Sequence, residues 1–74
     1  MSIKDQLFRI AAEEHLWKSG ESDTIVGNAH SYKLMKSING WWDLDILGRH
    51  TERICCGSLS RAISRICKME NIEY

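Results

Sequence analysis

Residues whose types and spacing suit phosphate binding lie near the end of the chain. Arg61, Arg65 and Lys68 are four and three positions apart, and Ser60 and Ser64 lie between them. At about 100° per residue, these five side chains share one side of a helix. Guanidinium and ammonium groups bind phosphate oxygens, and small serines leave the long basic side chains room to approach a polyanion. The spacing therefore predicts a binding surface on one helix.

The other side of the same segment is apolar, which predicts an amphipathic helix packed against a core. Gly57 and Ser58 supply a chain break and an N-cap at its start. The apolar side is formed by Leu59, Ala62, Ile63, Ile66, Cys67 and Met69.

Residues 57–66 resemble the recognition helix of helix-turn-helix and winged-helix regulators. In these regulators a Gly-Ser start precedes small polar and basic residues that face the major groove. The resemblance implies binding to nucleic acid. A compact helix-turn-helix also has a support helix that ends only a few residues earlier, whereas residues 49–56 intervene in this chain.

The basic residues are concentrated in one part of a neutral chain. The 74 residues include 10 basic and 10 acidic side chains, so the formal net charge is zero. Between residues 46 and 69, five Arg or Lys residues oppose one acidic residue, Glu52. Neutrality argues against generic polyanion binding, but the local excess predicts a basic surface. Arg49 and Arg53 would then add phosphate contacts beside the C-terminal helix.

The other reactive side chains form no catalytic or metal-binding pattern. Asp43 and Asp45 share one face of a predicted strand, but no nucleophile or phosphate-binding loop accompanies them. His50 and the three cysteines lack the paired spacing of a structural zinc site. We therefore expect a non-enzymatic protein that has neither a metal ion nor a cofactor.

Size and cysteine usage indicate a small cytoplasmic protein. A chain of 74 residues is expected to form a single small globular domain. Cys55 and Cys56 are adjacent, and three cysteines cannot close a disulfide framework, which favours a reducing compartment. No apolar run approaches the roughly 18 residues that cross a membrane, so we expect no membrane association.

The N-terminal segment predicts a helix over residues 3–18 that starts with a capping box formed by Ser2 and Asp5. This helix has two apolar stripes, and one of them is expected to face the core. The second stripe includes Phe8 and Leu16. It would be buried within the domain, or covered by a protein partner or a second copy of the chain.

The middle of the chain predicts a second helix and then a β-hairpin. Asn28 is a good N-cap for a helix over residues 29–38, and residues 24–26 could form a brief strand before it. Apolar and acidic residues alternate over residues 42–46, and residues 52–56 could form the returning strand. The expected fold is α+β, a single small domain of two N-terminal helices, a short β-hairpin and a C-terminal amphipathic helix.

Two functions follow from these features. The leading hypothesis is a small regulatory protein that binds nucleic acid through the C-terminal helix. The alternative is a protein-binding inhibitor or adaptor, of the kind found among phage and mobile-element accessory proteins. In the hairpin, Trp42 would face the core and Trp41 would face outward, because neighbouring strand residues point to opposite sides. An exposed Trp41, with Phe8 and Leu16, would provide the protein-binding surface.

Overall fold

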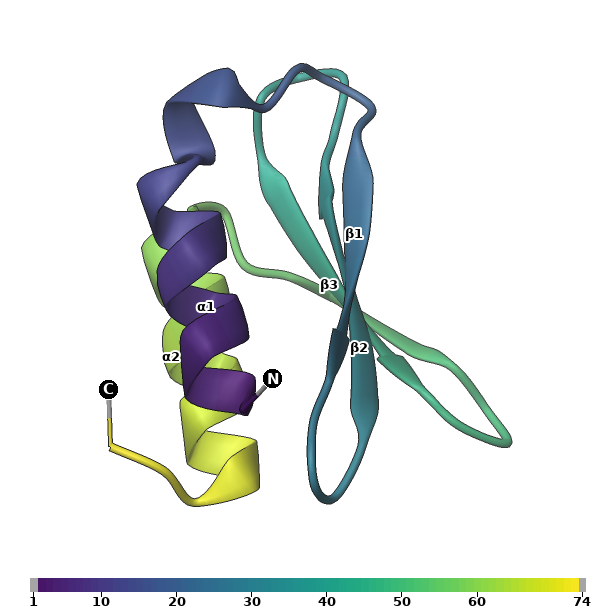
Figure 1. The fold of residues 1–74 in the computed structure, drawn as a ribbon. Coiled ribbons are helices and arrows are strands. Elements are labelled where there is room, and N and C mark those ends of the chain that lie inside the picture. The colour runs from purple at the N-terminus through teal and green to yellow at the C-terminus, as the bar shows by residue number, and fades with distance from the viewer. Residues whose placement is uncertain (1, 74) are drawn as a thin grey trace.

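A computed structural model describes residues 2–73, which form a four-stranded antiparallel sheet with two helices on one of its faces (Figure 1). The strands lie in chain order across the sheet. In sequence the elements are helix α1 (Ile3–Ala12), the short 3-10 helix η1 (Glu14–Leu16), strands β1 (Ser22–Val26), β2 (Ser31–Lys36), β3 (Trp42–Leu47) and β4 (Glu52–Cys55), and helix α2 (Leu59–Glu70).

The chain is mixed α+β, but the predicted arrangement of two N-terminal helices and a single hairpin is wrong. Residues 29–38 form no helix, because most of them belong to β2. Tyr32 and Leu34 are buried, while Lys33 and Met35 alternate with them on the other face. This two-residue period is that of a strand. Pairing with β1 and β3 satisfies the backbone hydrogen bonds of the segment, and Ile38 in the next turn is 90% exposed.

The N-terminal helix begins where the capping pattern predicts and ends earlier than expected. The amide of Asp5 donates to the Ser2 hydroxyl at 3.1 Å, which confirms the N-cap. Helix α1 stops at Ala12, and η1 leads into an extended Trp17. The Trp17 ring lies 5.1 Å from the Trp42 ring. The extended backbone at Trp17 is therefore accompanied by packing of its ring on the sheet residue Trp42.

The predicted brief strand and the predicted hairpin are both confirmed, although each belongs to a larger sheet. Residues 24–26 lie in β1, which pairs with β2. Strands β3 and β4 pair in register, with Leu44 opposite Ile54 and Asp45 opposite Arg53. As expected for a strand, Trp42 faces the core at 4% exposure and Trp41 points outward at 55% exposure.

The core lies between the helices and the inner face of the sheet. It contains the N-terminal helix residues Ile3, Leu7 and Ile10, the sheet residues Ile25, Tyr32, Leu34, Trp42 and Leu44, and the α2 residues Leu59, Ala62, Ile63, Ile66 and Cys67. Burial of these side chains supplies the main driving force for holding α2 on the sheet.

A buried carboxylate fastens the C-terminal end of α2 to the turn between β1 and β2. Glu70 accepts hydrogen bonds from the Tyr32 hydroxyl at 2.6 Å and from the backbone amides of Asn28, Ala29 and His30 at 2.6 to 3.1 Å. Burial alone would raise the pKa of Glu70, but these donors together hold it below its ordinary value. The orientation of α2 is therefore set by a specific polar contact as well as by apolar packing.

Candidate nucleic-acid interface

Helix α2 is positioned so that its polar side remains exposed. The Ser58 hydroxyl accepts from the amide of Arg61 at 3.2 Å, which confirms the predicted N-cap. Asn71, in the left-handed conformation at φ 56°, ends the helix. The apolar side is buried in the core, and Ser60, Arg61, Ser64, Arg65 and Lys68 are exposed.

An open hollow of about 490 Å³ lies between the exposed side of α2 and the edge strand β4, and we call it the basic groove. Its β4 side is formed by Ile54, Cys55 and the following Cys56. Its α2 side is formed by the five predicted contact residues, Ser60, Arg61, Ser64, Arg65 and Lys68. None of the eight lining residues is acidic, so the groove combines three cations with two hydroxyls.

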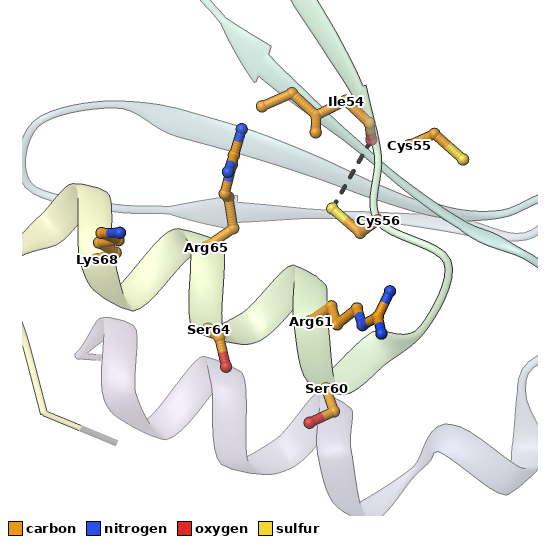
Figure 2. Close-up of a pocket in the computed structure, with 8 residues that line it drawn as sticks. All are labelled: Ile54, Cys55, Cys56, Ser60, Arg61, Ser64, Arg65 and Lys68. Atoms are coloured by element: carbon orange, nitrogen blue, oxygen red, sulfur yellow. Dashed lines mark hydrogen bonds between the residues drawn. The ribbon is translucent and has the colours of Figure 1, made fainter.

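The five residues of α2 do not all point the same way (Figure 2). Arg65 extends toward β4 and Arg61 toward the loop that joins β4 to α2, while the hydroxyls of Ser60 and Ser64 turn to the opposite flank. Both serines also line a smaller hollow of about 160 Å³ beside Ala11 and Glu14. The cations therefore border the sheet, and the serines border the N-terminal helical segment.

The β4 wall of the groove was not among the residues predicted to form the site. Ile54 offers a half-buried apolar side chain there. Burial raises the pKa of the Cys56 thiol, while the charge of Arg65 acts in the opposite direction. The Cys56 thiol lies 3.8 Å from the carbonyl oxygen of Ile54. The Cys56 side chain thus packs against the edge strand, and all three cysteines are free.

Arg53 and Arg49 are not in the basic groove. Arg53 faces the open side of the sheet, where its guanidinium binds both oxygens of Asp45 at 2.7 and 3.1 Å. The hydrogen bond from Arg53, against the opposing effect of burial, lowers the pKa of Asp45, and the charge of nearby Lys33 acts in the same direction. Asp45 is only 8% exposed, so Arg53 is engaged in a structural pair. Arg49 is exposed in the turn between β3 and β4.

The residues predicted for a protein interface are exposed on separate elements. Phe8 on α1 is 54% exposed, and Leu16 at the end of η1 is 64% exposed. The second stripe of the N-terminal helix is therefore not part of the core. Trp41 lies on the other layer of the molecule, next to β3.

Among residues 2–73, no group of three or more His, Cys, Asp or Glu side chains is arranged to hold a metal ion. Neither helix in the same range has the length and apolar character needed to cross a membrane.

Comparisons with known proteins identify no relative. No family model, no curated protein and no solved structure matches this chain. Functional assignment therefore depends on the physical chemistry of the basic groove.

Proposed function

We propose that this protein binds nucleic acid through α2, with the basic groove as the phosphate-binding surface. The observation that carries the proposal is the gathering of Arg61, Arg65 and Lys68 beside one hollow whose lining contains no carboxylate. Arginine donates paired hydrogen bonds to phosphate oxygens, and lysine contributes a point charge. The serine hydroxyls can donate to phosphates or to base edges from the other flank of the helix.

The zero net charge limits this binding to one part of the surface. Acidic side chains elsewhere would repel a nucleic acid that approached from another side, so affinity should depend on a few local ion contacts. Such binding is expected to weaken steeply with salt, because each phosphate contact releases condensed counterions. We expect a non-enzymatic regulatory protein of the cytoplasm, where its three free cysteines would stay reduced.

The test is a titration of labelled nucleic acid by fluorescence anisotropy at several salt concentrations. The double variant Arg61→Gln/Lys68→Gln should bind more weakly, and its log–log salt slope should fall by about 1.5 to 2 because two phosphate contacts are lost. Lys4→Gln/Lys18→Gln is the matched control, since it removes the same charge from exposed positions outside the groove.

The two variants separate a local site from a general charge effect. Equal weakening by both would mean that net charge alone drives binding. Absence of binding by the native protein to any nucleic acid at about 50 mM salt, where such contacts are strongest, would eliminate the proposed function.

A protein-binding inhibitor or adaptor is the second candidate, and the exposure of Trp41 favours it. Large aromatic side chains are enriched among residues that dominate binding energy in protein interfaces. Under this alternative, a pull-down from cell lysate would retain the same partner after nuclease treatment, and Trp41→Ala would release it. Phe8→Ala/Leu16→Ala would lower the sedimentation coefficient if the partner is a second copy of the chain.

A further inference from the structure

The two edges of the sheet differ in how their backbone groups are engaged. At the β1 edge, the Gln6 amide pairs with both backbone groups of Val26. The carboxylate of Asp23 accepts from the amide of Thr24 at 2.8 Å on the same strand. The β4 edge has no such cover among residues 2–73, and α2 packs mainly on β3 rather than on β4. A sheet edge left open in this way is a template for pairing with another strand.

The open backbone groups of β4 belong to Arg53 and Cys55. In an antiparallel ladder, alternate residues direct both of their backbone groups to the same neighbouring strand. Cys56 donates its amide to the carbonyl oxygen of Trp42, so the even-numbered residues of β4 face β3. Arg53 and Cys55 therefore direct two amides and two carbonyl oxygens away from the sheet, toward the place of a fifth strand.

One antiparallel register of β4 with a second β4 uses all four of these groups without opposing like charges. Opposed residues share a face of the sheet, so the two-fold axis passes through a residue. An axis at Glu52 or Arg53 would oppose two like charges, which is destabilising. An axis at Cys55 would place Arg53 opposite Gly57, beyond the bulge where two successive amides share one acceptor. An axis at Ile54 pairs Arg53 with Cys55 of the second copy in both directions.

The register centred on Ile54 also gives Glu52 a neighbour of opposite charge. Glu52 would lie opposite Cys56 of the second copy, beside the loop toward which Arg61 extends (Figure 2). In its own chain, Glu52 shares a hollow of about 310 Å³ with Arg65 and Lys68. Each Glu52 would therefore lie between cations of both copies and offset part of their charge.

The two α2 helices would not collide in this arrangement. Because α2 packs mainly on β3, three strand spacings would separate the two helix axes, which is about 14 Å. Helices in direct contact need only about 8–10 Å between their axes. The half-buried Ile54 side chains of both copies would meet beneath the gap, and the two basic grooves would join above them.

We propose that two copies of this chain pair antiparallel through β4, about a two-fold axis at Ile54, to form one eight-stranded sheet. The surface is self-complementary, as an isologous interface requires. A net charge of zero leaves no overall repulsion between the copies, and a domain of 74 residues is of the size that oligomerisation often stabilises. The pairing does not rest on nucleic-acid binding. Under the proposed function, the dimer would present two joined basic grooves to one ligand.

The first test is sedimentation velocity of the protein alone from about 1 μM to 1 mM, a range that covers weak and moderate interfaces. The native chain should shift from monomer to dimer as the concentration rises. Cys55→Pro should stay monomeric, because proline removes an outward amide that the β3–β4 ladder does not use. Cys55→Ala keeps that amide and is the matched control. Thermal unfolding shows whether each variant keeps the fold.

Amide hydrogen exchange locates the interface in the native protein without any substitution. The amides of Arg53 and Cys55 should exchange rapidly in dilute solution. They should slow about tenfold when about nine-tenths of the chain is dimeric, because exchange then occurs from the remaining monomer. The amide of Thr24, which Asp23 already engages at the β1 edge, should exchange at the same rate at both concentrations.

Exchange of two charges tests the register. Glu52→Arg and Arg61→Glu should each weaken association about tenfold, because like charges would then meet on both sides of the axis. The double variant Glu52→Arg/Arg61→Glu should restore association to within about threefold of the native value, since opposite charges again face each other. A double variant that associates as weakly as the single variants would overturn the register centred on Ile54.

Three other results would overturn the proposal. The first is a native chain that stays monomeric at about 1 mM. The second is a dimer that Cys55→Pro leaves intact, and its loss in Phe8→Ala/Leu16→Ala would place the interface on the N-terminal helical segment. The third is protection of Arg53 and Cys55 only by an added peptide of alternating glutamate and valine, which would assign the β4 edge to an acidic strand of another protein. None of these experiments contains nucleic acid, so their failure leaves the proposed function standing.

Discussion

The side-chain amide of Gln6 pairs with the backbone of Val26 as a neighbouring strand would. Gln6 Nε2 donates to the carbonyl oxygen of Val26 at 3.0 Å, and Gln6 Oε1 accepts from the Val26 amide at 3.0 Å. Val26 ends the edge strand β1, whose outward backbone groups would otherwise be open to another chain. Helix α1 thus closes part of this sheet edge with a single residue.

Replacement of Gln6 by glutamate tests this pairing. The introduced carboxylate cannot donate to the Val26 carbonyl. One of its oxygens would instead face the carbonyl oxygen of Val26 and repel it in a largely buried site. We expect Gln6→Glu to lower the free energy of unfolding by about 1–3 kcal/mol at neutral pH. As the pH falls, the introduced carboxyl gains a proton and can donate again, so part of the loss should be recovered. Urea denaturation at several pH values measures both effects.

Gln6→Met is the control for that experiment. It removes the pairing without adding a titratable group, so its loss of stability should not depend on pH. The pairing would be refuted as a stabilising contact if both variants were as stable as the native protein at neutral pH.

A second prediction concerns the pH dependence of stability through Glu70. The groups that donate to Glu70 hold its pKa in the folded protein below the ordinary value of 4.5. A lowered pKa means that the stabilisation is complete above the unfolded value and is lost as the pH falls through the folded value. Glu70→Gln should lower the free energy of unfolding by about 2–3 kcal/mol at neutral pH, because an amide nitrogen replaces one acceptor oxygen.

The difference between Glu70→Gln and the native protein should shrink as the pH falls below about 4.5. Chemical denaturation between acidic and neutral pH would show this as two converging curves. Glu21→Gln changes an exposed carboxylate and should run parallel to the native curve. A constant difference across the whole range would mean that the ionised form of Glu70 contributes nothing.

A third prediction uses two glycines that differ only in their surroundings. A Cβ atom at Gly27 would lie 2.7 Å from the carbonyl oxygen of His30 and 2.8 Å from Cδ of Glu70. We expect Gly27→Ala to lower the free energy of unfolding by about 1–3 kcal/mol, because a backbone oxygen cannot move aside without disturbing the turn.

Gly48→Ala is the matched control in the other turn at the same end of the sheet. Nothing lies within 4 Å of its Cβ position, and its φ is not in the left-handed region. The free energy of unfolding of Gly48→Ala should differ from that of the native protein by less than about 0.5 kcal/mol. Thermal or urea unfolding compares the two variants, and equal stability would argue against close packing of Glu70 on Gly27.

A fourth prediction separates the two adjacent tryptophans. Trp42 packs against Trp17 in the core, whereas Trp41 is exposed. Trp42→Ala should lower the free energy of unfolding by about 3–5 kcal/mol, as other buried aromatic truncations do. Trp41→Ala should change it by less than about 0.5 kcal/mol. Equal losses in urea unfolding would show that both rings are buried.

Local sequence patterns were enough to predict the helices at the two ends of the chain. Serine at positions 2 and 58 marked both helix starts because its hydroxyl accepts from an amide that the helix itself leaves unpaired. The amphipathic period of α2 identified the exposed cations, and the alternation around Trp42 identified the hairpin. These features depend on neighbours within a few residues, so the sequence carries them directly.

The middle of the chain was decided by tertiary contacts. Residues 31–36 have an apolar content that suits a helix or a strand, and pairing with β1 and β3 selects the strand. The chain after α1 makes a contact between Trp17 and Trp42, which are distant in sequence, so local patterns could not predict it. The role of Glu70 had one signal in the sequence, which is a carboxylate on the apolar side of a helix. The backbone amides that donate to it lie in a turn about 40 residues away, so the sequence alone could not identify them.

The same distinction applies to the site. The sequence alone identified Arg61, Arg65 and Lys68 as one set, because helical spacing brings them to one side. It also grouped Arg53 with them. In the structure, the register of β3 and β4 places Arg53 opposite Asp45, and the Arg53 guanidinium binds the Asp45 carboxylate on the open face of the sheet. The β4 wall of the basic groove exists only because α2 returns to the sheet beside its edge strand. Helical periodicity is encoded locally, whereas the packing of two elements depends on contacts between residues far apart in the chain.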